Sequence, residues 1–179
     1  MRTDEPWLFK LLRHRWRDFS DTRRWVPDDM AERLSDRIQA SEARHTGEVR
    51  ICVEASLPLH DLYRLGRDAT LATVIRDRAW DWFGDLRVWD TERNNGVLIY
   101  LLLAEQAIEV VADRALSRAI DQQQWEAIVG RLGQRLKKGE VEDGLTAALE
   151  EVSALLVEAF PLGAGEVRPD ELPNFVVRA

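Results

Sequence analysis

Apolar side chains recur every three or four residues in several stretches of the chain, which is the spacing of amphipathic helices. The first of these helices begins after Pro27, because proline is tolerated in the first turn, and its apolar stripe is Met30, Leu34 and Ile38. The last must end before Pro161, since proline cannot continue a helix. The predicted helices cover residues 28–46, 68–84, 121–138 and 141–160.

Shorter stretches show the patterns of strands. Apolar and charged residues alternate in EVRICVEASL, which predicts a strand over residues 49–55 with one buried face. The run GVLIYLLLA, residues 96–104, shows no alternation and predicts a strand buried on both faces. Residues 107–113 alternate again, and only residues 105–106 separate them from that run, so these two strands form a hairpin. Residues 175–177 offer an edge strand.

The order helix, strand, helix, strand, strand, helix, helix predicts an α/β fold with helices on both faces of a small mixed sheet. The second helix is a crossover, so the first two strands run parallel, and the hairpin adds an antiparallel strand. We expect residues 27–161 to form one α/β domain. A basic, aromatic-rich segment, residues 1–26, precedes this domain, and a tail rich in glycine, proline and charge, residues 162–179, follows it.

Composition and charge narrow the classes of function. The 179 residues suffice for one domain with a hydrophobic core. The formal net charge of −7 argues against nucleic-acid binding, which needs a basic surface facing the phosphates. The longest apolar run, residues 97–104, is far shorter than a transmembrane helix, and the N-terminus has no signal-peptide core. The single cysteine, Cys52, cannot form an internal disulfide, so we expect a soluble cytoplasmic protein.

The charge is unevenly distributed along the chain. Residues 1–24 carry a net charge of +3, and the remainder carries −10. The basic segment also contains Trp7, Phe9, Trp16 and Phe19, so it is able to form an amphipathic helix. The apolar face of such a helix either packs on its own domain, which is the more common use, or lies on a membrane surface or a protein partner.

The predicted topology brings acidic and amide side chains to one edge of the sheet. Two parallel strands begin there and the antiparallel strand ends there, which places Glu48, the loop 90–95 and Asp113 together. Carboxylates this close repel each other unless a cation lies among them, and calcium and magnesium prefer such oxygen ligands. The competing interpretation is that the loop caps local backbone and that Asp113 pairs with Arg114 or Arg93.

The chain lacks the usual signs of a catalytic nucleophile. No glycine-rich phosphate loop and no Asp-x-Asp pair occurs, and Cys52, in the middle of a strand, is expected to be a packing residue. His14, His45 and His60 are scattered without metal-ligand spacing. We expect His45 to be a hydrogen-bonded structural residue rather than a base.

Three segments together are similar to a TPM domain, a family named after thylakoid-lumen, photosystem-associated and receptor-modulating founder proteins. They are TGEVRICVEASL, then LRVWDTERNNGVLIYLLLAEQAIEVVADR, and the two final helices around Trp125 and up to Phe160-Pro161. The resemblance covers about residues 28–161 and points to a branch of short, soluble bacterial members. It implies a three-layer α/β/α sandwich around a small mixed sheet of about four strands.

The resemblance also implies a site. Some members are similar to calcium-binding proteins with an acidic pocket at this edge of the sheet, and a phosphatase activity is attributed to the plant branch. Carried over to this chain, the metal ligands are Asp90, Glu92, Asn94 and Asp113, with Glu48 nearby.

Two functions follow as hypotheses. The first is a non-catalytic or weakly catalytic domain that binds calcium or magnesium and docks on a protein partner, at the inner membrane if residues 1–24 seek a lipid surface. The alternative is a metal-dependent phosphatase acting on phosphate esters, in which the cation activates water and Arg114 stabilises the charge of the transition state.

Overall fold

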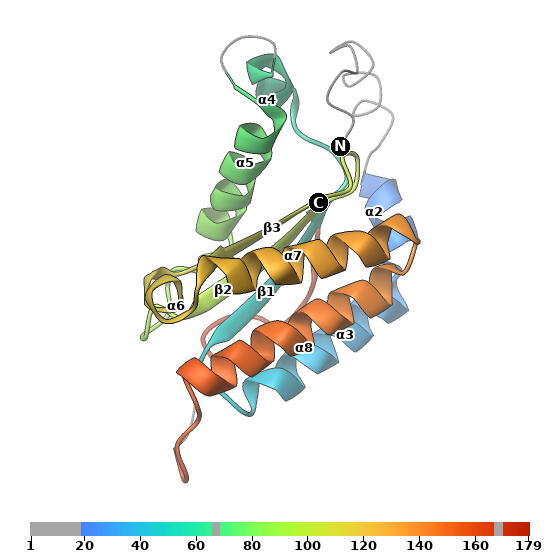
Figure 1. Cartoon of the computed structure of the whole chain (residues 1–179). Coiled ribbons are helices and arrows are strands. Elements are labelled where there is room, and N and C mark those ends of the chain that lie inside the picture. Colours follow the sequence, from blue (N-terminus) through green and yellow to red (C-terminus); the bar gives the residue numbers. More distant parts are fainter. Residues whose placement is uncertain (1–18, 66–68, 167–169) are drawn as a thin grey trace.

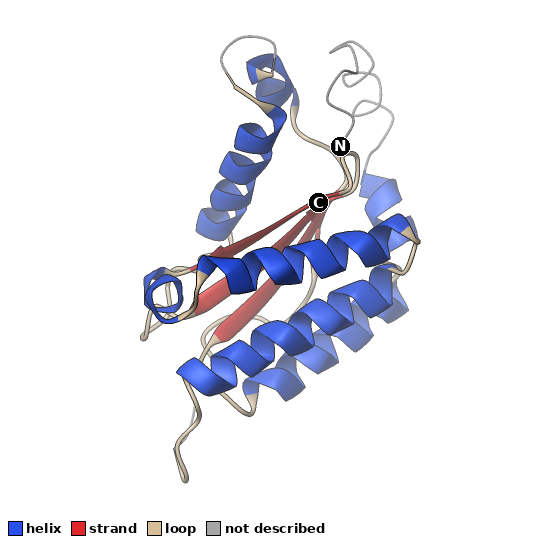
Figure 2. Ribbon diagram, in the orientation of Figure 1, coloured by secondary structure: helices blue, strands red, loops and turns tan. Residues whose placement is uncertain are grey.

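A four-stranded sheet forms the middle layer of the molecule, and helices cover both of its faces (Figure 1). The computed structural model describes residues 19–65, 69–166 and 170–179. The predicted α/β/α sandwich is confirmed, with strands enclosed between helices (Figure 2). One face carries α3 (Asp28–Glu42), α7 (Gln122–Lys137) and α8 (Val141–Ala159), and the other carries α4 (Leu59–Arg64) and α5 (Leu71–Asp85).

The strand order in the sheet is β3-β2-β1-β4. As the crossover and the hairpin predict, β1 runs parallel to β2, and β2 pairs antiparallel with β3. The C-terminal β4 pairs parallel with the other side of β1, at Cys52 and Val53 only, so the first residues of β1 have no strand on that side. The strands are β1 (Glu48–Glu54), β2 (Gly96–Leu102), β3 (Ala107–Ala112) and β4 (Val177–Arg178).

Strand β1 differs from its prediction in one respect. Its alternation predicts one buried face, but every residue from Glu48 to Glu54 is buried. The apolar residues of β1 belong to the core beneath α3, α7 and α8, and Cys52 belongs to a second core under α5. The C-terminal segment, residues 170–176, adds the buried Leu172 to this second core. Charged side chains of β1 therefore lie in the interior, where each needs a partner.

The helix boundaries follow local chemistry. The Thr70 side chain accepts a hydrogen bond from the Thr73 backbone N–H at the start of α5, and Asp121 forms a capping box with Gln124 at the start of α7. The sequence patterns did not predict α4 and α6 (Arg114–Ala119), because six residues are too few to show an apolar period.

Most of the basic N-terminal segment, residues 1–18, lies outside the described residues. The end of the segment forms α2 (Phe19–Trp25), which contacts β1 and β4. Trp25 packs against the core, and Val26 is fully buried. None of the helices that the structure describes combines the length and the apolar character needed to cross a membrane.

Candidate functional site

Four polar side chains stand in a row on the face of β1 that points away from α3 and α8. They alternate with the apolar residues of the main core, and each is at most 5% exposed. Ionisable groups are seldom buried without a partner or a ligand, so this row is where a functional site is to be sought. The four are Glu48, Arg50, Cys52 and Glu54.

Three carboxylates meet beside the first residue of β1, and we call them the acidic cluster. Oxygens of Glu42, Glu48 and Asp170 all lie within 4.8 Å of one another. Glu42 is the last residue of α3, Glu48 is the first of β1, and Asp170 belongs to the C-terminal segment. The two glutamates are fully buried and Asp170 is exposed, so the acidic cluster has one side open to solvent.

The turn between α3 and β1 brings the two glutamates of the cluster together. His45, in that turn, is fully buried, and its ring nitrogens lie 3.0 Å from Ser41 Oγ and 3.0 Å from the Gly47 carbonyl oxygen. Both ring nitrogens are therefore used within the turn, which agrees with the structural role predicted for this histidine.

Backbone donors fix the two glutamates of the acidic cluster. Glu42 Oε1 accepts a hydrogen bond of 2.9 Å from the Val49 backbone N–H, in the part of β1 that β4 does not reach. Glu48 Oε1 accepts one of 3.3 Å from the Glu171 backbone N–H. The carboxylates thus join α3, β1 and the C-terminal segment in one corner of the molecule.

Two of the predicted ligands, Asp90 and Glu92, lie in the loop before β2. The Asp90 side chain is more than half exposed, and its carboxylate is 4.0 Å from the Arg87 guanidinium. Glu92 takes part in the site through its backbone, since its N–H donates to the Glu171 carboxylate at 2.8 Å. The loop is therefore tied to the C-terminal segment next to the acidic cluster.

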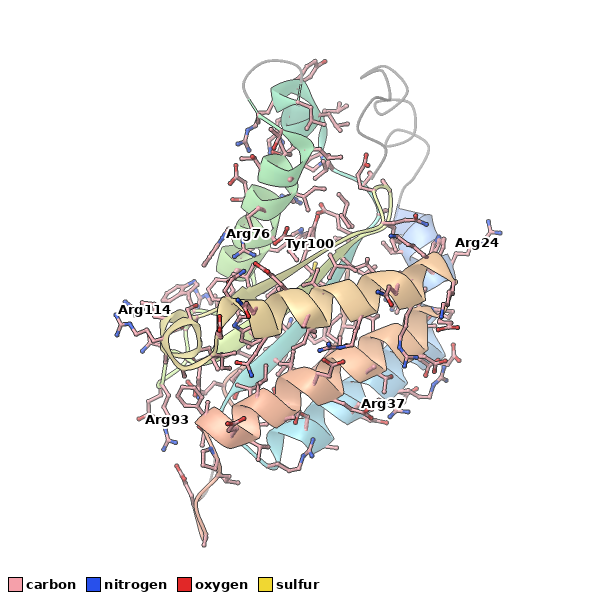
Figure 3. The ribbon with its side chains drawn as sticks, viewed as in Figure 1. Arg24, Arg37, Arg76, Arg93, Tyr100 and Arg114 are labelled. Atoms are coloured by element: carbon pink, nitrogen blue, oxygen red, sulfur yellow. The ribbon has the colours of Figure 1, made fainter. Side chains whose placement is uncertain are left out.

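The other two predicted ligands, Asn94 and Asp113, both interact with Arg114. Asn94 has a φ of 52°, a conformation that asparagine tolerates, and its side-chain oxygen accepts from the Arg114 guanidinium. Asp113 caps α6, with Oδ1 accepting from the Arg114 backbone N–H at 2.6 Å. Its Oδ2 is buried without a hydrogen-bond partner among the described residues. Arg114 itself extends outward at this end of the sheet, as does Arg93 (Figure 3).

The register brings Glu48 and Asp113 to the same edge of the sheet, as predicted, with Gly96 between them. Glu48 is aligned with Gly96, and the Asp113 backbone N–H donates to the Gly96 carbonyl oxygen at 2.9 Å. A Cβ atom on Gly96 would lie 2.0 Å from the Val88 carbonyl oxygen, so the loop before β2 rests directly on this glycine. The loop stands between the two acids, and the carboxylate of Glu48 joins those of Glu42 and Asp170.

Arg50 follows Glu48 by two residues on the same face of β1. It is 2% exposed, and its guanidinium carbon lies 4.7 Å from the centre of the Phe175 ring. Burial lowers the pKa of Arg50, while Cys52, Glu42 and Glu48 act in the opposite direction. The corner therefore holds a buried cationic group beside the buried carboxylates.

At the other end of β1, Glu54 is satisfied by protein donors. It accepts hydrogen bonds from Arg78 Nη2 at 2.6 Å, Trp82 Nε1 at 2.9 Å and Tyr100 Oη at 2.6 Å. Burial and the nearby charge of Glu54 raise the pKa of Tyr100 far above its ordinary value. Figure 3 shows Tyr100 on the sheet, with Arg76 of α5 nearby. This network, which the sequence patterns did not predict, clamps α5 onto the sheet and leaves Glu54 no role as a ligand.

Comparisons with known proteins agree with this architecture. The sequence model of one family, the TPM domain, matches residues 20–155. No curated protein matches the chain. Among solved structures, the chain is similar to the NMR structure of BA42 protein from the psychrophilic bacteria Bizionia argentinensis sp. nov., with a TM-score of 0.71 and 23% sequence identity over 86% of this chain and 95% of that chain. At this identity the likeness shows the fold alone.

Proposed function

The chain belongs to the TPM-domain family, and we propose that it binds a divalent cation, calcium or magnesium, at the acidic cluster. One observation carries the proposal: two fully buried carboxylates, Glu42 and Glu48, share a corner with Asp170, with oxygens within 4.8 Å of one another. Negative charges this close in a poorly solvated corner repel each other strongly, and a cation among them removes that repulsion.

The donor set suits a hard cation. Calcium takes about six to eight oxygen ligands, and magnesium is held by one or two carboxylates together with several waters. Three carboxylates supply part of either set, and the exposed position of Asp170 gives water access to the remaining positions. Cysteine and histidine, which zinc prefers, do not contribute to this group.

The ligand set predicted from the sequence is a rival site for the same cation. It shares Glu48 with the acidic cluster but otherwise uses Asp90, Glu92, Asn94 and Asp113. The buried Oδ2 of Asp113 supports it, because a buried carboxylate oxygen without a donor is a place for a ligand. The exposed Asp90 side chain speaks for the acidic cluster instead.

Calorimetry and thermal melting with calcium and with magnesium test the proposal. The parent protein is expected to bind the ion and to melt at a higher temperature, since a ligand at 100 times its Kd stabilises the folded state by about 2.7 kcal/mol. Asp170→Asn, at an exposed position that leaves the fold intact, should remove most of the heat of binding. Asp90→Asn serves as the matched control and should bind like the parent.

Each other outcome has a definite meaning. Loss of binding in Asp90→Asn but not in Asp170→Asn would move the cation to the rival site. Absence of heat and of a melting shift in the parent protein at millimolar ion would refute cation binding altogether.

A protein partner and a cytoplasmic location remain part of the proposal. The partner rests on the family resemblance, and the location on the single cysteine, which is buried and unpaired. The alternative of a metal-dependent phosphatase has one supporting observation, the buried Arg50 beside the acidic cluster.

A further inference from the structure

Arg50 is a buried charged side chain whose donors are not all used. It is 2% exposed, and its Nε and Nη1 atoms have no hydrogen-bond partner within the described parts of the chain. Glu42 and Glu48 therefore do not accept hydrogen bonds from these two atoms. A buried cationic donor without an acceptor destabilises the fold, so its presence indicates an acceptor that binds from outside the chain.

The position of Arg50 connects it with the acidic cluster. Arg50 and Glu48 are separated by two residues on one face of a strand, a distance of about 7 Å along the chain. The Phe175 ring that covers the guanidinium is 56% exposed, so it forms the outer wall between Arg50 and solvent. Phe175 lies on the same C-terminal segment as Asp170, so one segment borders both groups.

We propose that Arg50 binds the oxyanion of a phosphate-type ligand, which at the same time contacts the cation held by the acidic cluster. This inference rests on the proposed cation site. A guanidinium offers a planar fork of donors that matches two oxygens of a phosphate group. A divalent cation attracts the remaining oxygens of the same group.

The charges of the corner make the two ligands interdependent. In the absence of a cation, the carboxylates of Glu42 and Glu48 repel an anion that approaches Arg50. A bound cation reverses the sign of that interaction. Magnesium should therefore raise the affinity for phosphate, and phosphate should raise the affinity for magnesium by the same factor, because coupling between two sites is reciprocal.

Phe175 competes with the ligand for Arg50. Its ring lies over the guanidinium in a cation–π contact, so an anion reaches Arg50 only after the ring turns away. Its large exposed fraction shows that little packing opposes this movement. Removing the ring should therefore favour the anion.

Calorimetric titration with inorganic phosphate, at saturating magnesium and without magnesium, tests the proposal. Arg50→Met should weaken phosphate binding by about tenfold or more, the equivalent of one hydrogen-bonded charge pair. Phe175→Ala should strengthen it. Arg114→Met removes an exposed guanidinium from the same edge of the sheet and should leave binding unchanged. Replacement of a buried charge by a hydrophobic residue of similar size is often tolerated, and melting of Arg50→Met checks that it folds.

The outcomes separate this inference from the proposed function. If the parent protein binds magnesium but not phosphate, or if Arg50→Met binds phosphate like the parent, the anion site is refuted while the cation site stands. If the parent does not bind magnesium, the proposed function fails, and the titration without magnesium decides: phosphate binding that depends on Arg50 supports the anion site, and its absence overturns it. Equal weakening in Arg50→Met and Arg114→Met would show general electrostatic attraction and would also overturn it.

Discussion

Residues of one type on one face of β1 meet different fates, and the difference lies in their donors. Glu54 accepts hydrogen bonds from three side chains and is a structural group. Glu48 accepts from a backbone N–H and shares its corner with two other carboxylates. Burial alone does not distinguish a structural acid from a ligand; the number and charge of the donors around it does.

The first prediction at this scale concerns Tyr100, whose hydroxyl donates to Glu54 at 2.6 Å. Because its pKa is raised above the ordinary value of about 10, the unfolded chain ionises before the folded protein does. The contribution of Tyr100 to stability is therefore complete below pH of about 10 and is lost as the pH rises toward the folded pKa. Tyr100→Phe should lower the free energy of unfolding by about 1–3 kcal/mol at pH 7, since it removes a hydrogen bond to a buried carboxylate.

Urea unfolding of the parent and of Tyr100→Phe at pH 7 and above pH 10 measures both effects. The difference between the two proteins should shrink at the higher pH. Tyr63→Phe is the control, because Tyr63 is 64% exposed, and it should have little effect at either pH. A difference that stays constant between the two pH values would contradict the prediction.

At the scale of elements, the loop before β2 decides which side chains meet. Its Val88 carbonyl rests on Gly96, where a side chain would lie 2.0 Å from the oxygen. The glycine therefore allows the loop to cover the start of β2 and to stand between Glu48 and Asp113. Loop and strand form one unit because a residue without a Cβ lies at their contact.

A pair of glycine substitutions tests this contact. Gly96→Ala should lower the free energy of unfolding by about 1–3 kcal/mol or more, because Cβ meets backbone that cannot turn aside. Gly84→Ala in α5 should instead raise it by about 0.4–1 kcal/mol, since nothing lies within 4 Å of its Cβ position and alanine favours the helix. Chemical denaturation of both variants gives the two values, and equal effects would show that the loop is not fixed at Gly96.

At the scale of the whole molecule, the C-terminal segment joins parts that are far apart in the sequence. Leu172 and Val176 are buried in different cores on the two sides of the sheet. The Ala179 backbone pairs with Val53 and Ala55, which completes the sheet beside β1. The matched family region ends at residue 155, so this segment is an addition to it in this chain.

Removal of residues 172–179 should therefore lower the free energy of unfolding by about 3–6 kcal/mol, from two buried side chains at about 1.5–3 kcal/mol each. Urea denaturation measures the loss. Replacing the exposed Phe175 by alanine is the matched control and should cost much less, because its ring contacts solvent over more than half of its area. Full stability of the truncated chain would mean that the segment only rests on the sheet.

The sequence by itself determined the elements and their topology. The helical spacing of apolar residues, the uninterrupted run of β2 and the short link to β3 are local patterns, and local patterns suffice to place a crossover and a hairpin. They also gave one unused sign of the site: Glu42 follows Met30, Leu34 and Ile38 at the same interval of four, so a charged residue stands on the buried stripe of α3.

The tertiary structure alone decided which charged residues share a corner. Glu48 and Asp170 are separated by most of the chain, and their approach depends on the C-terminal segment crossing beside β1. The alternation of β1 reports polarity and not exposure, so it could not show that Glu48 and Arg50 are buried. Their burial depends on what covers the second face, and that is fixed by long-range packing, which no local pattern in the sequence records.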